Sequence, residues 1–360
     1  MVPAERGSNG PNAFPLLTAL IESRDYPIDR LVPALVAGYE AAGLLEQAFA
    51  RATTPAGMRS TALYGAVAAA AATGKLMALD ERSLSAALAN AASFSGGLLQ
   101  SFAEGTDEWR YQVGAVGKAG WLAAELAKAG SIAAVEAFEG KAGFARVFAR
   151  SDCDVDALAS ALGRDWAILR VTFKPFPVCA FNQTPVTAAL ALKEKLGGAG
   201  VRAVRVRMNP FETGYAGMDA VGPFNSISGT LMSIPFCIAR TLIYGVPDMK
   251  RMTTYDDPKV NELIGRIRLV TDAGVPTLSA VIEADTADGR TTVQDQQMTA
   301  RDYAYDRATV SKMIRRIGNE QDVPATAFDR IETFVDRWPA SSIDDVLKSF
   351  AMIEPKRKAA

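Results

Sequence analysis

The most informative property of this 360-residue sequence is that it contains no histidine. Histidine is the side chain whose unperturbed pKa lies closest to neutral pH, so proton-transfer sites commonly use it. Any acid–base chemistry in this protein therefore depends on other groups, such as lysine, tyrosine and the carboxylates.

Cysteine is also scarce. Cys153, Cys179 and Cys237 are scattered and lack the paired spacing of a zinc site or a disulfide framework. The sequence also has no close set of carboxylates at metal-ligand spacing. We therefore expect a cytoplasmic protein that needs no metal and no cofactor.

The sequence has neither an excess of charge of one sign nor an apolar run of membrane-spanning length. Lys plus Arg (39) nearly balances Asp plus Glu (40), so the sequence predicts no surface for nucleic acid or anionic lipid. The longest apolar stretch, residues 62–72, is mostly alanine and too short to cross a membrane. A small-molecule substrate is the expected partner.

The first half of the chain is predicted to be helical. Apolar residues recur there at helical spacing, and alanine is frequent, which permits close packing between helices. Turn and cap residues such as Asp80 separate the segments. The predicted helices are residues 31–50, 60–77, 83–93, 115–129 and 155–162.

Strand patterns begin after Trp166. Residues 167–173 have strand character, and residues 201–208 alternate so that Val204, Val206 and Met208 share one face and Arg205 and Arg207 the other. A further strand at 277–284 leads into a hairpin around Asp288-Gly289. Helices are expected between these strands at 185–196, 227–244 and 258–267, and again at 325–338 and 341–352.

These patterns predict a mainly α protein with a large all-helical domain and a smaller α+β lid. Residues 1–168 form the helical domain, and residues 169–318 form the lid. Residues 319–360 are helical and return to the first domain.

Four segments carry a family resemblance. They are the alanine-rich helix from Thr61 to Asp80, the helix and small-residue end from Ala89 to Leu98, the glycine-punctuated segment from Gly105 to Gly120, and Phe173-Lys174-Pro175-Phe176-Pro177-Val178-Cys179. In this order they resemble the MmgE/PrpD family, which includes 2-methylcitrate dehydratases, cis-aconitate decarboxylases and iminodisuccinate epimerases.

The resemblance implies a large helical domain, a smaller lid and a homodimer formed through the helical domain. It also implies that the chain begins inside the family's helical region. Apolar helix faces would then be uncovered, and large exposed apolar patches are uncommon on monomers. We expect a homodimer for both reasons.

The departures from the family concern its histidines. One family histidine falls on Arg59, two fall on Gln112 and Lys118, and one falls on Gln183. The family lysine falls on Trp109, and only the adjacent arginine is matched, at Arg110. The cations that would bind carboxylates therefore survive better than the acid–base groups.

A candidate site follows from this alignment of motifs. We predict that Lys118 moves a proton with a pKa lowered by burial, that Tyr111 is an acid, and that Arg59 anchors an anion. The predicted substrate-binding residues, which are expected to converge with these three in one cleft, are Trp109, Arg110, Gln112, Lys174 and Gln183.

Structural interpretations of the same residues stay open. Arg59 and Lys118 either reach a ligand or lie in solvent on helix surfaces. Trp109 either contacts a ligand or fills the core. Tyr215, between Gly214 and Gly217, is either a lid residue or part of a simple loop.

Three classes of function remain. In the first, the protein is a metal-independent lyase, isomerase or cyclase that acts on an organic acid or a related secondary metabolite. In the second, it is a catalytically inactive homologue that serves as a scaffold partner. In the third, it binds a small molecule without turnover.

Overall fold

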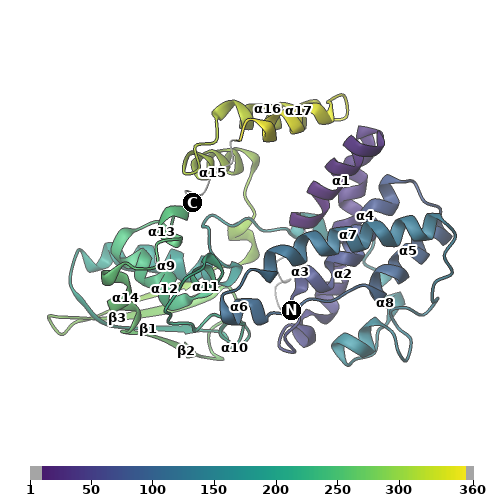
Figure 1. The fold of residues 1–360 in the computed structure, drawn as a ribbon. Helices are drawn as coiled ribbons and strands as arrows, with labels where there is room; N and C mark the ends of the chain where they lie inside the picture. The colour runs from purple at the N-terminus through teal and green to yellow at the C-terminus, as the bar shows by residue number, and fades with distance from the viewer. Residues whose placement is uncertain (1–9, 354–360) are drawn as a thin grey trace.

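The computed structural model describes residues 10–353 and shows a mainly helical protein with one small sheet (Figure 1). The first half of the described chain is helical. Its helices are α1 (Gly10–Arg24), α2 (Leu31–Thr53), α3 (Ser60–Leu63), α4 (Gly65–Leu76), α5 (Glu81–Ser93), α6 (Gln100–Glu104), α7 (Glu108–Lys128) and α8 (Val155–Ala159).

Helix α4 lies at the centre of this half and packs against α2, α5 and α7. Small side chains make the close packing possible. A Cβ atom at Gly120 of α7 would lie 2.4 Å from the Cβ atom of Ala69 in α4, so only glycine fits at this crossing. Asp80 caps α5 as predicted, because its carboxylate accepts a hydrogen bond from the backbone N–H of Ser83.

The sheet has four strands in the order β2-β1-β3-β4. Strand β1 (Val201–Met208) pairs parallel with β2 (Ile267–Thr271) and antiparallel with β3 (Ser279–Thr286), which forms a hairpin with β4 (Thr291–Gln297). The predicted alternation is confirmed, since Val204, Val206 and Met208 are buried while Arg205 and Arg207 form ion pairs on the other face.

Helices cover the buried face of the sheet in the second half of the chain (Figure 1). Helices α9 and α12 pack against it, and their side chains form one apolar core with the buried face of the sheet. The helices of this region are α9 (Gln183–Leu196), α10 (Pro210–Thr213), α11 (Ile227–Met232), α12 (Ile234–Tyr244), α13 (Met249–Met252) and α14 (Pro258–Ile264).

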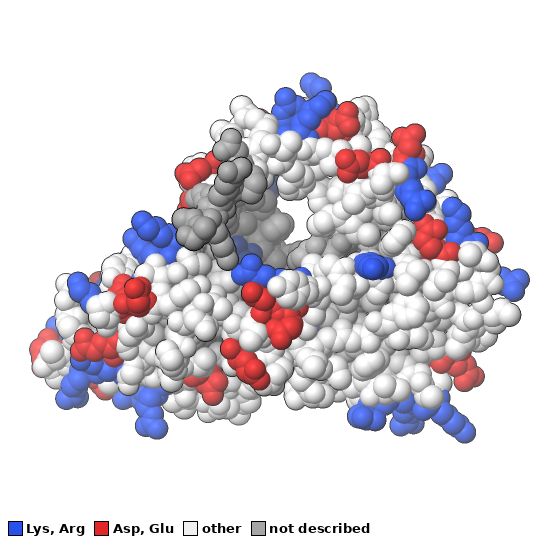
Figure 2. Space-filling view, in the orientation of Figure 1, with Lys and Arg blue, Asp and Glu red and all other residues white. Residues whose placement is uncertain are grey.

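The last three helices connect the two halves. They are α15 (Arg307–Asn319), α16 (Ala325–Arg337) and α17 (Ile343–Ala351), which form an arch over the molecule in Figure 1. Phe334 and Val346 pack into an apolar cluster with Leu17 and Leu31. The space-filling view shows an opening beneath this arch, and charges of both signs are interspersed over the face in view (Figure 2).

The strand predicted at residues 167–173 is wrong. The chain instead forms a 3₁₀ turn, η3 (Ala167–Arg170), followed by an extended segment in which the Phe173 N–H donates to the Tyr303 carbonyl without forming a strand. The reason is tertiary, because the carboxylate of Glu40 in α2 accepts hydrogen bonds from the N–H groups of Ala167 (3.0 Å) and Ile168 (3.1 Å). These bonds satisfy the first backbone N–H groups of a helical turn, so the same N–H groups do not pair with a neighbouring strand.

Other predicted boundaries also differ. The helix expected at 227–244 is divided at Ser233, which caps α12 just before Pro235 removes a backbone donor. Helix α7 begins at Glu108, seven residues before the predicted start at 115. Helix α15 and strand β2 were not predicted. The division into domains at 168 and 318 stays a prediction, and residues 1–9 and 354–360 lie outside the described part.

Within residues 10–353, no helix combines the length and the apolar character that a bilayer span requires.

Candidate functional site

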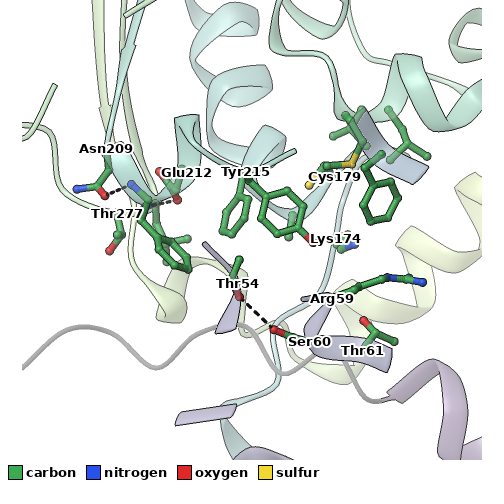
Figure 3. A pocket seen from close by; sticks show the side chains of 18 of the residues that line it. Thr54, Arg59, Ser60, Thr61, Lys174, Cys179, Asn209, Glu212, Tyr215 and Thr277 are labelled. Carbon is green, nitrogen blue, oxygen red and sulfur yellow. Dashed lines mark hydrogen bonds between the residues drawn. The ribbon is translucent and has the colours of Figure 1, made fainter. Parts of the chain in front are cut away.

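A cavity of about 950 Å³ lies between the helical half and the sheet-containing half of the molecule. Its walls come from α2, the start of α3, the start of α7, the segment after Phe173, the loop around Tyr215 and the loop before β3. Its titratable side chains are Glu46, Arg51, Arg59, Lys174, Cys179, Glu212 and Tyr215. Arg59, Lys174 and Cys179 lie on one side in Figure 3, and Asn209, Glu212 and Thr277 lie on the other.

Arg59 is positioned by its backbone at the entry to α3. Its N–H donates to the carbonyl of Gly97, and its own carbonyl accepts from the N–H of Leu63. Its guanidinium donates to the carbonyl of Trp109 and to Oε1 of Gln112 (3.1 Å). The side chain also lies over the rings of Phe102 and Trp109, at 5.3 Å and 5.9 Å from the ring centroids.

The charge of Arg59 is buried without a carboxylate. The residue is only 8% exposed, and among residues 10–353 none of the ion pairs includes it. Burial lowers the pKa of Arg59, while Tyr215 and Cys179 act in the opposite direction. A guanidinium stays protonated at neutral pH despite such a shift. A buried cation with neutral partners is a site that favours an anionic ligand.

Tyr215 faces this cation from the second half of the chain. The loop that carries it follows α10 and packs on Phe102, where a Cβ atom at Gly217 would lie 2.3 Å from the Phe102 carbonyl oxygen. Burial is the largest cause that raises the pKa of Tyr215, and the nearby Arg59 lowers it. Tyr215 therefore remains a protonated phenol at neutral pH, and its ring lies edge-on to that of Phe181 at 5.1 Å.

Two acidic side chains line the cavity. The Oε1 atom of Glu212 accepts a hydrogen bond from the backbone N–H of Leu278 (3.0 Å), so this carboxylate supports the loop before β3. Glu46 belongs to α2, and its charge contributes to the raised pKa of Tyr215. Glu46 is therefore the acid that is electrically coupled to the phenol.

Gln183 supports the cavity wall from behind. It is fully buried, and its amide donates to the carbonyls of Phe176, Val178 and Cys179 and accepts from the Phe176 N–H, at 3.1 to 3.2 Å. Gln183 was predicted to bind substrate, but its side chain does not line the cavity. It holds the segment that places Lys174 and Cys179 at the cavity, and the substrate-binding role of Lys174 stays a prediction.

Helix α7 divides the remaining predicted residues between two faces. Trp109 lines the cavity, and Gln112, one turn later, accepts from Arg59 and donates to the carbonyl of Leu98 (3.0 Å). Tyr111 and Lys118 are seven residues apart and share the outer face. Tyr111 is 69% exposed, Lys118 is exposed, and neither lines the cavity.

The convergence predicted for these residues is therefore incomplete. Arg110 stacks on the Trp109 ring at 5.2 Å and pairs with Asp107 at the surface. Arg59, Trp109 and Lys174 line the cavity and Gln112 bonds to Arg59 from outside it, whereas Arg110, Tyr111 and Lys118 do not line the cavity. The catalytic roles assigned to Lys118 and Tyr111 stay predictions without support from this geometry.

Sequence reasoning did not select Glu46, Phe181, Phe211 or Glu212. The available signal for Glu46 was an acidic residue inside an otherwise apolar helical stripe. Among residues 10–353, no group of three or more Cys, Asp or Glu side chains is arranged to hold a metal ion.

Comparison with known families gives two matches. The MmgE/PrpD N-terminal domain matches residues 3–155, and the MmgE/PrpD C-terminal domain matches residues 176–315. A search of curated proteins found no match.

Proposed function

Because the chain belongs to the MmgE/PrpD family, we propose that it is an enzyme of the lyase type that acts on an organic acid in the cavity between its two halves. The observation that carries this proposal is the buried guanidinium of Arg59, which has no carboxylate partner among the described residues. A substrate carboxylate would supply the missing negative charge.

Substrate binding begins at the cationic side of the cavity. Within residues 10–353, the hydrogen bonds of the Arg59 guanidinium come from its Nη1 atom, and we infer that the donors on Nη2 and Nε receive a carboxylate. Lys174 lies on the same side (Figure 3) and adds a second cation to the wall. Neutralising the carboxylate makes the neighbouring C–H group more acidic.

Proton transfer then requires a base and an acid. We assign Glu46 as the base that removes the proton from the carbon beside the carboxylate. The electron pair forms a carbon–carbon double bond, and the hydroxyl on the next carbon leaves with the Tyr215 proton as water. Arg59 stabilises the resulting phenolate, in agreement with its lowering effect on the pKa of Tyr215. Return of a proton to the opposite face of the carbon would give isomerisation instead.

The arrangement of the halves supports a lid. The cavity wall includes α2 and α7 from the predicted helical domain and the segments at Cys179 and Tyr215 from the predicted α+β lid. We therefore retain residues 1–168 with 319–360 as the helical domain and residues 169–318 as the lid that excludes water from the reaction.

A small-molecule binder without turnover is the second candidate. The complete absence of histidine favours it, because an enzyme must then transfer protons without the side chain best suited to neutral pH. Arg59 would hold the same carboxylate in either case, so only turnover separates the two functions.

The test uses a panel of 2-hydroxy and 3-hydroxy acids incubated with the purified protein in D₂O. Proton NMR detects deuterium exchange beside the carboxylate and new vinyl protons. We expect Arg59→Gln, Tyr215→Phe and Glu46→Gln each to reduce turnover at least about a hundredfold. Arg82→Gln, on the exposed surface of α5, is the control. If these acids bind without deuterium exchange or elimination, the enzymatic function is wrong and the small-molecule binder is supported.

A further inference from the structure

The cavity has a continuous aromatic wall. Four successive ring contacts, with centroid separations between 5.1 and 6.3 Å, connect five side chains that all line the cavity. In order along the wall, these side chains are Trp109, Phe102, Tyr215, Phe181 and Phe211.

The cation lies at one end of this wall. Arg59 lies over the rings of Trp109 and Phe102, which are the first two members of the run. The rings of Phe181 and Phe211 follow beyond Tyr215 and meet nearly edge to face, at 84°. A ligand whose carboxylate reaches Arg59 therefore extends its carbon skeleton along aromatic surface.

The cavity lining includes a third cation, Arg51, and the side across from Arg59 and Lys174 in Figure 3 carries a carboxylate. Glu212 lies there with Asn209 and Thr277, across the cavity from Arg59 and Lys174 (Figure 3). A polycarboxylate that extends from the cations would bring its second negative charge toward this acidic side chain. Neutral polar groups such as hydroxyls are compatible with the same neighbours.

The size of the cavity agrees with a large ligand. Its volume of about 950 Å³ lies at the upper end of the range that holds drug-sized molecules. Aliphatic side chains, including Leu231 and Met232, complete the lining. A compact acid of few carbons would leave most of this apolar surface in contact with water.

We propose that the cavity selects a monocarboxylic acid with an extended aromatic or unsaturated skeleton, and that the wall from Trp109 to Phe211 recognises that skeleton. The inference rests on the proposed function in taking Arg59 as the carboxylate anchor. It goes further by naming the substrate class and the residues that set specificity.

Isothermal titration calorimetry with defined probes tests this selection independently of turnover. We expect 2-naphthoate to bind at least about tenfold more tightly than tricarballylate, which carries three carboxylates and no apolar skeleton. Arg59→Gln should weaken 2-naphthoate at least about tenfold and the neutral 2-naphthamide less than about threefold. Phe181→Leu should weaken both aromatic probes at least about fivefold, because the ring contact is lost.

Controls separate specificity from folding. Phe148→Leu changes an aromatic side chain in the helical core that does not line the cavity, and it should leave all affinities unchanged. If Phe181→Leu fails to fold, Phe211→Leu and competition between 2-naphthoate and tricarballylate on the unmodified protein give the same comparison.

The outcomes distinguish this inference from the proposed function. Tricarballylate binding as tightly as 2-naphthoate, or undiminished 2-naphthoate binding by a folded Phe181→Leu variant, would overturn the aromatic selection. Turnover of a small polycarboxylate that 2-naphthoate does not inhibit would also overturn it while supporting the enzyme. If the expected affinities are found but no acid is turned over, the aromatic selection is supported and the proposed enzymatic function is wrong.

Discussion

At the residue scale, Arg59 combines deep burial with a positive charge. Its buried guanidinium has only the neutral oxygens of Trp109 and Gln112 as hydrogen-bond partners among the described residues. Burying a charge without an opposite charge is unfavourable. Replacing Arg59 by a neutral side chain therefore relieves the cost of the buried charge, but it also removes the hydrogen bonds to Trp109 and Gln112. In the unfolding free energy, the relieved cost of the buried charge and the loss of these hydrogen bonds oppose each other. In ligand binding, the loss of the cation has no such opposing gain.

Arg59→Gln and Lys118→Ala therefore decide between the geometric and the sequence-based assignments. Arg59→Gln should change the unfolding free energy by no more than about 1 kcal/mol and reduce turnover at least about a hundredfold. Lys118→Ala should keep full turnover, because Lys118 lies on the outer face of α7. Chemical denaturation and the D₂O assay measure both. A tenfold loss in the Lys118 variant would restore that lysine as the proton-transfer group.

Tyr215 predicts a specific response to alkaline pH. Burial raises its pKa above the ordinary value of 10.0, so the unfolded chain loses this phenol proton first as the pH rises. The contribution of the neutral phenol to stability is intact below pH 10 and falls as the pH rises toward the folded-state pKa.

Melting temperatures between pH 8 and pH 11 provide the measurement. Tyr215→Phe cannot ionise, so its melting temperature should fall less steeply above pH 10 than that of the unmodified protein. Tyr111→Phe changes an exposed tyrosine and should keep the original slope. Identical slopes for Tyr215→Phe and the unmodified protein would show that the phenol is not desolvated in the folded state.

At the scale of elements, one buried amide contributes four hydrogen bonds to the segment before α9, which backbone bonds from Phe173 and Cys179 also connect to Tyr303 and Leu231. Gln183 bonds to backbone groups of Phe176, Val178 and Cys179, and all of these bonds are buried or partly buried. The segment has no regular hydrogen-bond ladder of its own. The side chain of Gln183 thus satisfies backbone groups of this wall that strand pairing would satisfy in a sheet.

Gln183→Leu should lower the unfolding free energy by about 2–4 kcal/mol, because it leaves several buried backbone groups without partners at similar volume. The denaturant midpoint measures this loss. Gln47→Leu, which removes one long exposed hydrogen bond to Arg170, should change stability little. A Gln183→Leu midpoint equal to that of the Gln47 variant would contradict the supporting role.

At the scale of the whole molecule, the outer face of α7 is the strongest support for a dimer. Tyr111, Leu122 and Leu126 are exposed there, and Ile132 and Val135 in the loop that follows are 96% and 94% exposed. Large side chains of this kind are rarely left together in water on a monomer.

We expect a homodimer that buries this face. Leu122→Glu combined with Leu126→Glu should convert it to a monomer, because each charge would be buried at the interface without a partner. Sedimentation velocity at micromolar concentration gives the oligomeric state. Arg146→Glu, a charge change at another exposed position, is the control. A monomeric unmodified protein at this concentration would refute the dimer.

Local periodicity was sufficient where one face of an element is buried and the other is not. The alternation in β1 and the helical spacing in α2 and α5 therefore predicted these elements closely. It failed at η3, where Glu40, more than a hundred residues away in sequence, turns an apparent strand into a helical turn. It also failed at the start of α7, which begins at Glu108, so the turn that carries Trp109 and Tyr111 was not predicted to be helical.

The sequence by itself determined the family, the mainly helical character, the balance of charge and the absence of any imidazole. These properties depend on composition and on patterns within short segments. Only the tertiary structure decided which titratable groups meet. Glu46, Arg59 and Tyr215 lie on separate segments. The effect of Glu46 and Arg59 on the pKa of Tyr215 depends on how α2, α3 and the Tyr215 loop pack around one cavity, which no local pattern encodes.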